Sequence, residues 1–180
     1  GYRNLYGVIL SSIGEYERSS RIYAELLAEY PANAKAWLSY GHVLKTEGRS
    51  DESIDAYRQS IARDPALGDA YWSLANLKTF RFDEADLAAM RAQLANTGLD
   101  DMARLHFHFA LGKAYEDAGD YTRSFEHYSK GNALERAGSP AVAVHTQPFA
   151  RLAKAVALAN GMPTARQAFV PQPLVGRSAG

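Results

Sequence analysis

The sequence predicts an all-α fold built from repeated helical hairpins. A pattern of glycine, polar residues, a small residue and tyrosine occurs three times, starting at Gly14, Gly48 and Gly119. The first two glycines are 34 residues apart and the last two are 71 apart, close to two such periods. A fixed period of this length is typical of proteins in which each repeat is one helical unit. Pro31 and Pro65 follow the first two glycines at equal distance and end the predicted second helices, because proline cannot continue a helix interior.

Each unit is predicted to contain two helices that meet at the glycine, which can adopt positive φ and end the first helix. In the second helix the small residue and the tyrosine are four residues apart, as in Ser53 and Tyr57, and so share one face. The first helix carries a small residue between two bulky ones, as in Trp37, Gly41 and Leu44, which lets a neighbouring helix approach closely. We interpret these repeated residues as packing contacts between successive hairpins.

These features resemble the tetratricopeptide repeats, whose 34-residue pattern W-x2-L-G-x2-Y…A-x3-F…P describes helix-turn-helix units. The strongest match is "AWLSYGHVL" followed by "GRSDESIDAYRQSIARDP". The third unit departs most, because its glycine and its small–Tyr pair are absent; there Asp83 is predicted to cap a helix. The resemblance implies a right-handed solenoid of about four hairpins over residues 1–137, with units of about 1–33, 34–67, 68–104 and 105–137.

Three further segments are predicted after the repeats. Residues 138–145 contain a glycine and a proline and are predicted to form a linker. Residues 146–160 have amphipathic periodicity and are predicted to form a C-terminal helix that caps the solenoid. Residues 161–180 are predicted to be a proline-rich irregular tail, which we also interpret as the start of a domain missing from this chain.

In this family the first helices line the concave side of the solenoid, where partners bind. In each first helix, the position one residue after a packing residue lies about 100° further around the helix axis. These positions form the candidate groove. The predicted peptide-binding residues are Asn4, Val8, Leu38, His42, Lys45, Trp72, Asn76, Phe109, Lys113 and Glu116.

Two interpretations stay open for several of these residues. Trp72 and Phe109 are either aromatic binding anchors or side chains that fill the inner curve between helices. His42 and Lys45 either hold a carboxylate or are solvated polar residues. The carboxylate clamp with which some family members grip acidic C-terminal peptides is matched only in part, so we do not expect that ligand.

Composition argues against several classes of partner. Twenty basic and twenty acidic residues give a formal net charge of +0, so we expect neither nucleic acid nor an anionic membrane as a partner. No apolar run approaches the roughly 20 residues that span a bilayer. Cysteine is absent, which excludes disulfides and thiolate chemistry and is typical of a reducing compartment. We therefore expect a cytoplasmic protein.

No catalytic, metal or cofactor site is predicted. His106 and His108 are two residues apart on a helix and point to opposite sides, so we interpret His108 as structural. The acidic run "DEAD" at Asp83–Asp86 is interpreted as helix capping, because acidic side chains stabilise a helix N-terminus. No nucleophile elbow, zinc-protease motif or complete phosphate loop occurs. The predicted function is a non-catalytic scaffold, without a cofactor, that binds a protein or peptide.

A second resemblance leaves an alternative function open. The stretch from "DAYWSLANLKTFRFDEADLAAM" to "PLVGRSAG" is similar to bacterial proteins that join tetratricopeptide repeats to a C-terminal sulfotransferase domain. The resemblance implies a loop G-x-P-R-S-G-T-T that binds the 5′-phosphate of the sulfuryl donor. Gly176, Arg177 and Ser178 match this loop, but its proline is missing and Ala179 interrupts it. The alternative is therefore an accessory, substrate-presenting part of a sulfotransferase whose catalytic domain, roughly 250 residues, is absent from this chain.

Overall fold

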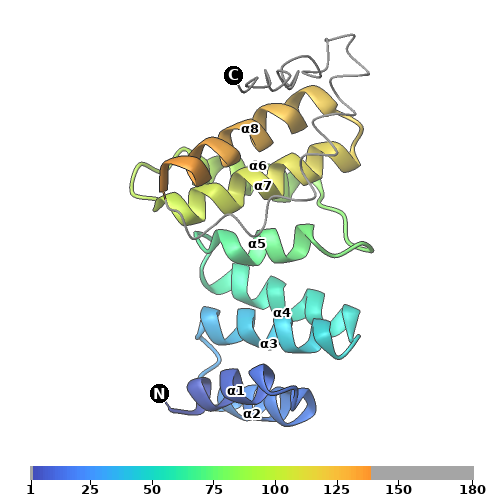
Figure 1. The fold of residues 1–180 in the computed structure, drawn as a ribbon, viewed down its shortest axis with the longest axis vertical. Coiled ribbons are helices and arrows are strands. Elements are labelled where there is room, and N and C mark those ends of the chain that lie inside the picture. Colours follow the sequence, from blue (N-terminus) through green and yellow to red (C-terminus); the bar gives the residue numbers. More distant parts are fainter. Residues whose placement is uncertain (1, 139–180) are drawn as a thin grey trace, which may run out of the picture. The chain divides into compact units, whose positions relative to one another are not determined.

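The computed structural model describes residues 2–138, which form eight α-helices and no strand. The first four helices are α1 (Tyr2–Ser12), α2 (Tyr16–Glu29), α3 (Ala34–Thr46) and α4 (Ser50–Arg63). The next four are α5 (Gly68–Ala75), α6 (Glu84–Leu94), α7 (Asp101–Asp117) and α8 (Tyr121–Gly138) (Figure 1). The predicted all-α class is confirmed, whereas the predicted linker, capping helix and tail lie outside the described residues.

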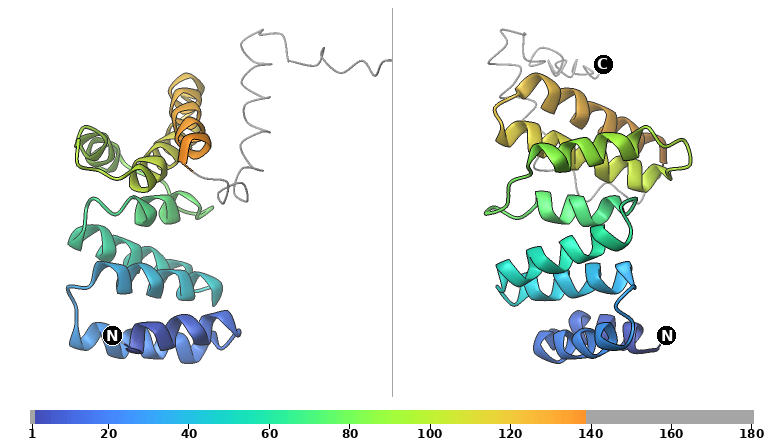
Figure 2. Two further views of the ribbon diagram at one scale, coloured as in Figure 1. Left: turned by 60° about the vertical axis from the view of Figure 1, so that its left-hand side comes forward. Right: turned by 180° about the vertical axis from the view of Figure 1, so that it is seen from behind.

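Three pairs of helices form hairpins: α1 with α2, α3 with α4, and α7 with α8. Successive units meet where a second helix contacts the next first helix, as α2 contacts α3 and α4 contacts α5. Figures 1 and 2 show the α1–α2 hairpin at one end, followed in order by α3, α4 and α5. Each hairpin therefore buries its apolar surface against its neighbours, as expected for repeated units.

The glycines at the hairpin turns have the predicted conformation. Gly14, Gly48 and Gly119 have φ angles of 85°, 80° and 78°. The residue after each glycine donates its backbone N–H to a carbonyl in the last turn of the first helix, as Arg49 does to Leu44 at 2.9 Å. This hydrogen bond closes a Schellman-type C-terminus, which requires the left-handed conformation that glycine adopts without strain.

The small residue in each first helix makes room for the tyrosine of the same hairpin. A Cβ on Gly41 would lie 2.5 Å from the ring of Tyr57, and a Cβ on Gly112 would lie 2.7 Å from the ring of Tyr128. These tyrosines are 0% and 5% exposed. The interpretation that the repeated residues join successive hairpins therefore needs a correction. The glycine–tyrosine contact lies within a hairpin, while Tyr57 also packs against Leu74 of the next unit.

The third unit keeps two helices but does not form a hairpin. α5 is only 8 residues long and contacts α4 and α7, whereas α5 and α6 do not approach each other closely. Asp83 caps α6, as predicted, and forms a capping box with Asp86. Asp86 is also paired with Arg58 of α4. Met90 of α6 and Phe107 of α7 lie in one buried cluster with residues of α5, so α7 packs directly on α5.

Candidate binding groove

The predicted groove residues lie on α1, α3, α5 and α7 or directly after them, and they differ in exposure. The exposed ones are Val8, His42, Lys45 and Asn76. The half-buried ones are Asn4, Trp72, Lys113 and Glu116. The buried ones are Leu38 and Phe109, at 8% and 3% exposed.

Leu38 and Phe109 belong to the packing between helices in this structure. Leu38 lies in a buried cluster with Tyr57. The ring of Phe109 rests on Gly131 of α8, where a Cβ would lie only 2.5 Å away. Neither side chain offers much surface to a ligand in this structure, and their place in the groove stays a prediction. The packing alternative is favoured for Phe109, because α8 approaches α7 closely at a residue without a side chain.

A small pocket lies between α1 and α3 and contains two of the predicted residues, Val8 and His42. Its volume is about 180 Å³. The lining residues are Val8, Ser11, Tyr16, Tyr23, Ser39, His42, Val43 and Thr46. Apolar side chains thus lie beside hydroxyl groups and an imidazole. Space of this size fits one side chain of a partner, and is small beside the roughly 300–1,000 Å³ of sites that enclose a whole small molecule.

His42 links the pocket to α5. Its Nε2 lies 2.9 Å from Oγ of Ser73, and its ring meets the ring of Tyr57 edge-on with centroids 5.5 Å apart. Although His42 keeps contact with solvent, desolvation of the ring lowers its pKa, Asp69 opposes this shift and Lys45 adds to it. The imidazole is therefore neutral at pH 7. A neutral His42 gives no charge to a carboxylate, which weakens the carboxylate-binding interpretation of His42 with Lys45.

Trp72 and Asn76 lie where α5 ends. The indole of Trp72 is half-buried and lies 5.4 Å from the ring of Phe109, measured between centroids. Asn76 caps the C-terminus of α5, and its Nδ2 donates to the backbone oxygen of Trp72 at 2.8 Å. α5 stops at Ala75, so Asn76 lies at the C-cap of the helix and not within it.

Lys113 and Glu116 are engaged within the protein. Lys113 is paired with Asp117, which also lies 3.6 Å from a guanidinium nitrogen of Arg81. Glu116 accepts a hydrogen bond of 3.0 Å from the hydroxyl of Tyr128. Burial raises the pKa of Tyr128, and the charge of Glu116 raises it further, so the phenol stays protonated and donates. This end of the predicted groove is therefore close to electrically neutral.

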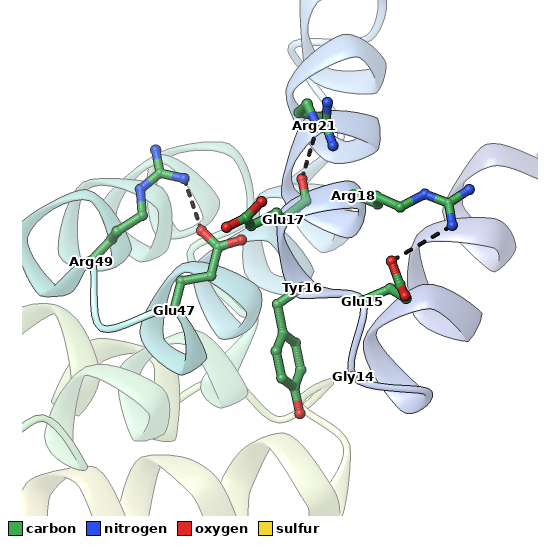
Figure 3. A pocket seen from close by; sticks show the side chains of 8 residues that line it. All are labelled: Gly14, Glu15, Tyr16, Glu17, Arg18, Arg21, Glu47 and Arg49. Atoms are coloured by element: carbon green, nitrogen blue, oxygen red, sulfur yellow. Dashed lines mark hydrogen bonds and ion pairs between the residues drawn. The ribbon is translucent and has the colours of Figure 1, made fainter.

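A larger pocket lies outside the predicted groove, beside the turns of the first two hairpins (Figure 3). Its volume is about 810 Å³, and it is lined by Gly14, Glu15, Tyr16, Glu17, Arg18, Arg21, Glu47 and Arg49. Its three arginines are matched by three glutamates. Arg49 pairs with Glu47 at 2.9 Å, and Arg18 lies 3.6 Å from Glu15. Sequence reasoning missed this hollow because its residues come from the turns of two hairpins, and no local motif encodes how those turns lie beside each other.

His108 has a partner that the sequence did not indicate. Its Nδ1 lies 3.0 Å from Nδ1 of His127 on α8, so one ring donates and the other accepts. Burial, together with nearby positive groups, lowers the pKa of His108 to about 4. The contact agrees with the structural interpretation of His108.

Within residues 2–138 no group of three or more His, Cys, Asp or Glu is placed to hold a metal ion. Nor is any helix of that range long and apolar enough to cross a membrane.

Family comparisons identify one of the predicted repeats. A family model described as "Tetratricopeptide repeat" matches residues 34–67, the bounds predicted for the second unit. A model described as "UGSC family" matches residues 128–180, most of which lie outside the described range. A comparison with curated proteins gave no match. The match to the repeat model thus lies at the place predicted for the second unit.

Solved structures of MamA share the fold. "Crystal structure of MamA" is 21% identical, with a TM-score of 0.58, and the match covers 86% of this chain and 82% of that one. "Crystal structure of MamA protein" is 19% identical, with a TM-score of 0.57 and coverage of 86% and 77%. MamA from Desulfovibrio magneticus RS-1 is 20% identical, with a TM-score of 0.51 and 76% coverage of each chain. At such identities the likeness concerns the fold, and it confirms the predicted helical solenoid.

Proposed function

We propose that this tetratricopeptide-repeat chain is a non-catalytic scaffold that binds a protein or peptide along its first helices. The observation that carries the proposal is the pocket between α1 and α3, which contains the predicted residues Val8 and His42. A recess that combines apolar, hydroxyl and imidazole groups suits one amphipathic side chain of a peptide. A cytoplasmic location belongs to the same proposal.

The charges near this face indicate which peptide fits best. His42 is neutral at pH 7, and Lys113 is already paired with Asp117. A peptide rich in acidic residues would therefore gain little from this surface. We propose a ligand of low net charge that places a small aliphatic side chain beside Val8 and extends toward Trp72. The polar atoms of its backbone would pair with the exposed side chains of Lys45 and Asn76.

The test is a selection from a phage-displayed random peptide library on the whole chain, followed by affinity measurements on variants. Val8→Asp places a charge at the pocket, and Thr46→Arg fills it. Each substitution is expected to lower the affinity for the selected peptides by about tenfold or more, as expected when a central contact is lost. Phe125→Asp is the matched control, since Phe125 on α8 is 47% exposed and Val8 is 48% exposed.

Two results would contradict this proposal. In the first, the selection enriches no peptide over beads without protein. In the second, the enriched peptides bind Val8→Asp and Thr46→Arg as well as they bind the unchanged chain. Circular dichroism of each variant shows whether the helices are retained, so that loss of binding is not mistaken for unfolding.

A second candidate function uses the same surface to present a protein substrate to a sulfotransferase domain. It is supported by the similarity of "DAYWSLANLKTFRFDEADLAAM" and "PLVGRSAG" to such proteins. The second stretch lies outside the described residues, and the matches above name no sulfotransferase. Because the phosphate loop is incomplete, we expect no heat in calorimetry with 3′-phosphoadenosine 5′-phosphate. Micromolar affinity for this nucleotide would favour the second candidate over the first.

A further inference from the structure

The hydroxyl groups of the pocket between α1 and α3 give their hydrogens to the protein itself. Ser11 of α1 lies within reach of two internal acceptors, the carbonyl oxygen of Gly7 at 3.1 Å and Oγ of Ser19 at 2.8 Å. Thr46 of α3 donates to the carbonyl oxygen of His42 at 3.0 Å. A hydroxyl has one hydrogen and two lone pairs, so Ser11 and Thr46 keep only lone pairs for a ligand.

The remaining hydroxyls of the pocket follow the same pattern, with one exception. The buried Tyr23 donates a long hydrogen bond, 3.5 Å, to the carbonyl oxygen of Asn4. Burial raises the pKa of Tyr23, and a hydrogen bond with Ser39 opposes this shift, so Ser39 is the donor of that bond. Among the lining hydroxyls only that of Tyr16, a residue 37% exposed, has no acceptor within residues 2–138.

The imidazole of His42 also presents an acceptor. Oγ of Ser73 on α5 lies 2.9 Å from Nε2 of His42 and 3.4 Å from Oδ1 of Asp69. An ionised carboxylate can only accept, so the single hydroxyl hydrogen of Ser73 belongs to Asp69, and Oγ accepts from Nε2–H of the ring. A neutral imidazole carries no second hydrogen. Nδ1 of His42 therefore has a lone pair that no donor within residues 2–138 uses.

We propose that this pocket selects an uncharged hydrogen-bond donor from the partner, such as the hydroxyl of threonine, and that Nδ1 of His42 is its main acceptor. The inference rests on the proposed function and refines it, since the methyl group of a threonine would contact Val8 while its hydroxyl donates to the ring. A carboxylate would add further lone pairs to a site that already consists of acceptors. A cation would lose its water without gaining a counter-charge, because none of the described lining residues is acidic.

The first measurement needs no ligand. Long-range ¹H–¹⁵N NMR correlations of the ¹⁵N-labelled whole chain at pH 7.5 show which ring nitrogen of His42 carries the hydrogen. The signals are assigned by their loss in His42→Phe. We expect Nε2 to be protonated and Nδ1 to be unprotonated. A hydrogen on Nδ1 would overturn the inference, because the pocket would then present a donor instead of an acceptor.

The second measurement compares three versions of one peptide from the phage selection. Nuclear Overhauser effects to the methyl groups of Val8 identify the peptide residue that enters the pocket. This residue is then made threonine, valine and aspartate in turn. Threonine and valine have nearly the same shape, so their comparison isolates the hydroxyl. We expect valine to lower the affinity by about fivefold relative to threonine, and aspartate to lower it further.

Two variants of the chain test the role of His42. In His42→Phe a ring remains but the acceptor is lost, so the threonine and valine peptides should bind alike. Lys45→Ala is the matched control, because Lys45 is exposed on the same helix but does not line the pocket. In this variant the preference for threonine should persist, whatever the change in overall affinity.

The outcomes separate this inference from the function on which it rests. If valine or aspartate binds the unchanged chain as tightly as threonine, or if the threonine preference survives in His42→Phe, only the inference is overturned. If the selection yields no peptide at all, the proposed function fails and the inference fails with it, even where the ring hydrogen lies on Nε2.

Discussion

The ring of Tyr57 occupies the space that a Cβ on Gly41 would need, 2.5 Å away. Gly41→Ala should therefore lower the free energy of unfolding, although alanine is the better helix former. Overpacking costs about 1–3 kcal/mol, and the gain in helix propensity is about 1 kcal/mol. We expect a net loss of up to about 2 kcal/mol in the free energy of unfolding, measured by urea unfolding followed by circular dichroism.

Gly98→Ala is the control for this substitution. A Cβ on Gly98 would meet only Oδ1 of Asn96, at an ordinary 3.5 Å. Gly98→Ala should change the free energy of unfolding by no more than about 0.5 kcal/mol. If Gly41→Ala stabilises the protein, the close fit between glycine and tyrosine is not what the hairpin requires.

The hydrogen bond between His108 and His127 makes stability depend on pH. Burial lowers the pKa of both rings, to about 4 for His108. The unfolded chain therefore binds more protons than the folded one between pH 6.5 and 4, and stability falls as the pH is lowered through this window. The charged groups that act on the pair are Arg91, Arg104, Arg123, Glu126 and Lys130. Four of these five groups are basic, so they oppose protonation.

Thermal unfolding at pH 7.5 and at pH 5 measures this contribution. Between pH 7.5 and pH 5, we expect the free energy of unfolding to fall by about 1–2 kcal/mol more in the unchanged chain than in His108→Asn. This figure allows for solvent screening of the half-buried rings. Carboxylates titrate in both proteins, so the difference between them isolates the histidine pair. Equal losses in both would mean that the pair does not control the pH response.

At the scale of elements, Asp86 ties the N-terminus of α6 to α4, in addition to the apolar packing of Leu87 and Met90. This residue completes the capping box with Asp83 and pairs with Arg58 of α4. Asp86→Asn should loosen α6 by about 1–3 kcal/mol, because it removes the charge of the buried partner from a half-buried ion pair. Hydrogen exchange read by mass spectrometry should show faster exchange in α6 and little change in α3. The control is Glu84→Gln, since the side chain of Glu84 is 78% exposed. Equal exchange in the two variants would contradict the role of Asp86.

The individual helices also show how much of the fold and of the groove could be predicted from the sequence. The period and the turn glycines predicted α1 to α4 and the α7–α8 hairpin, because each carries a local signal such as the positive φ of Gly48. The third unit lacks those signals, so the early end of α5 and the separation of α5 from α6 could not be predicted. Leu38 and Phe109 were assigned to the groove from the rotation of about 100° per residue of an ideal helix. Their burial depends on contacts with other helices, such as that of Phe109 with Gly131, which no single period encodes.

At the scale of the whole molecule, stability should vary along the stack. In a linear array each unit is stabilised by its neighbours. α1 packs against α2 within the first hairpin but has only minor contact with α3, and its outer face is exposed. Amides of α1 should therefore exchange faster than those of α3, which contacts both α2 and α4. Native-state hydrogen exchange tests this expectation, and uniform protection from α1 to α4 would show instead that the array unfolds as one cooperative unit.

The three hairpin turns have a stereochemical consequence. Gly14, Gly48 and Gly119 all have positive φ, and a Cβ added to any of them would meet no atom within 4 Å. That backbone geometry is the natural one for a residue of opposite handedness. D-alanine at each of these positions, introduced by chemical synthesis, should raise the thermal midpoint by restricting the unfolded chain, at about 0.4–1 kcal/mol per site. L-alanine at the same positions should lower it.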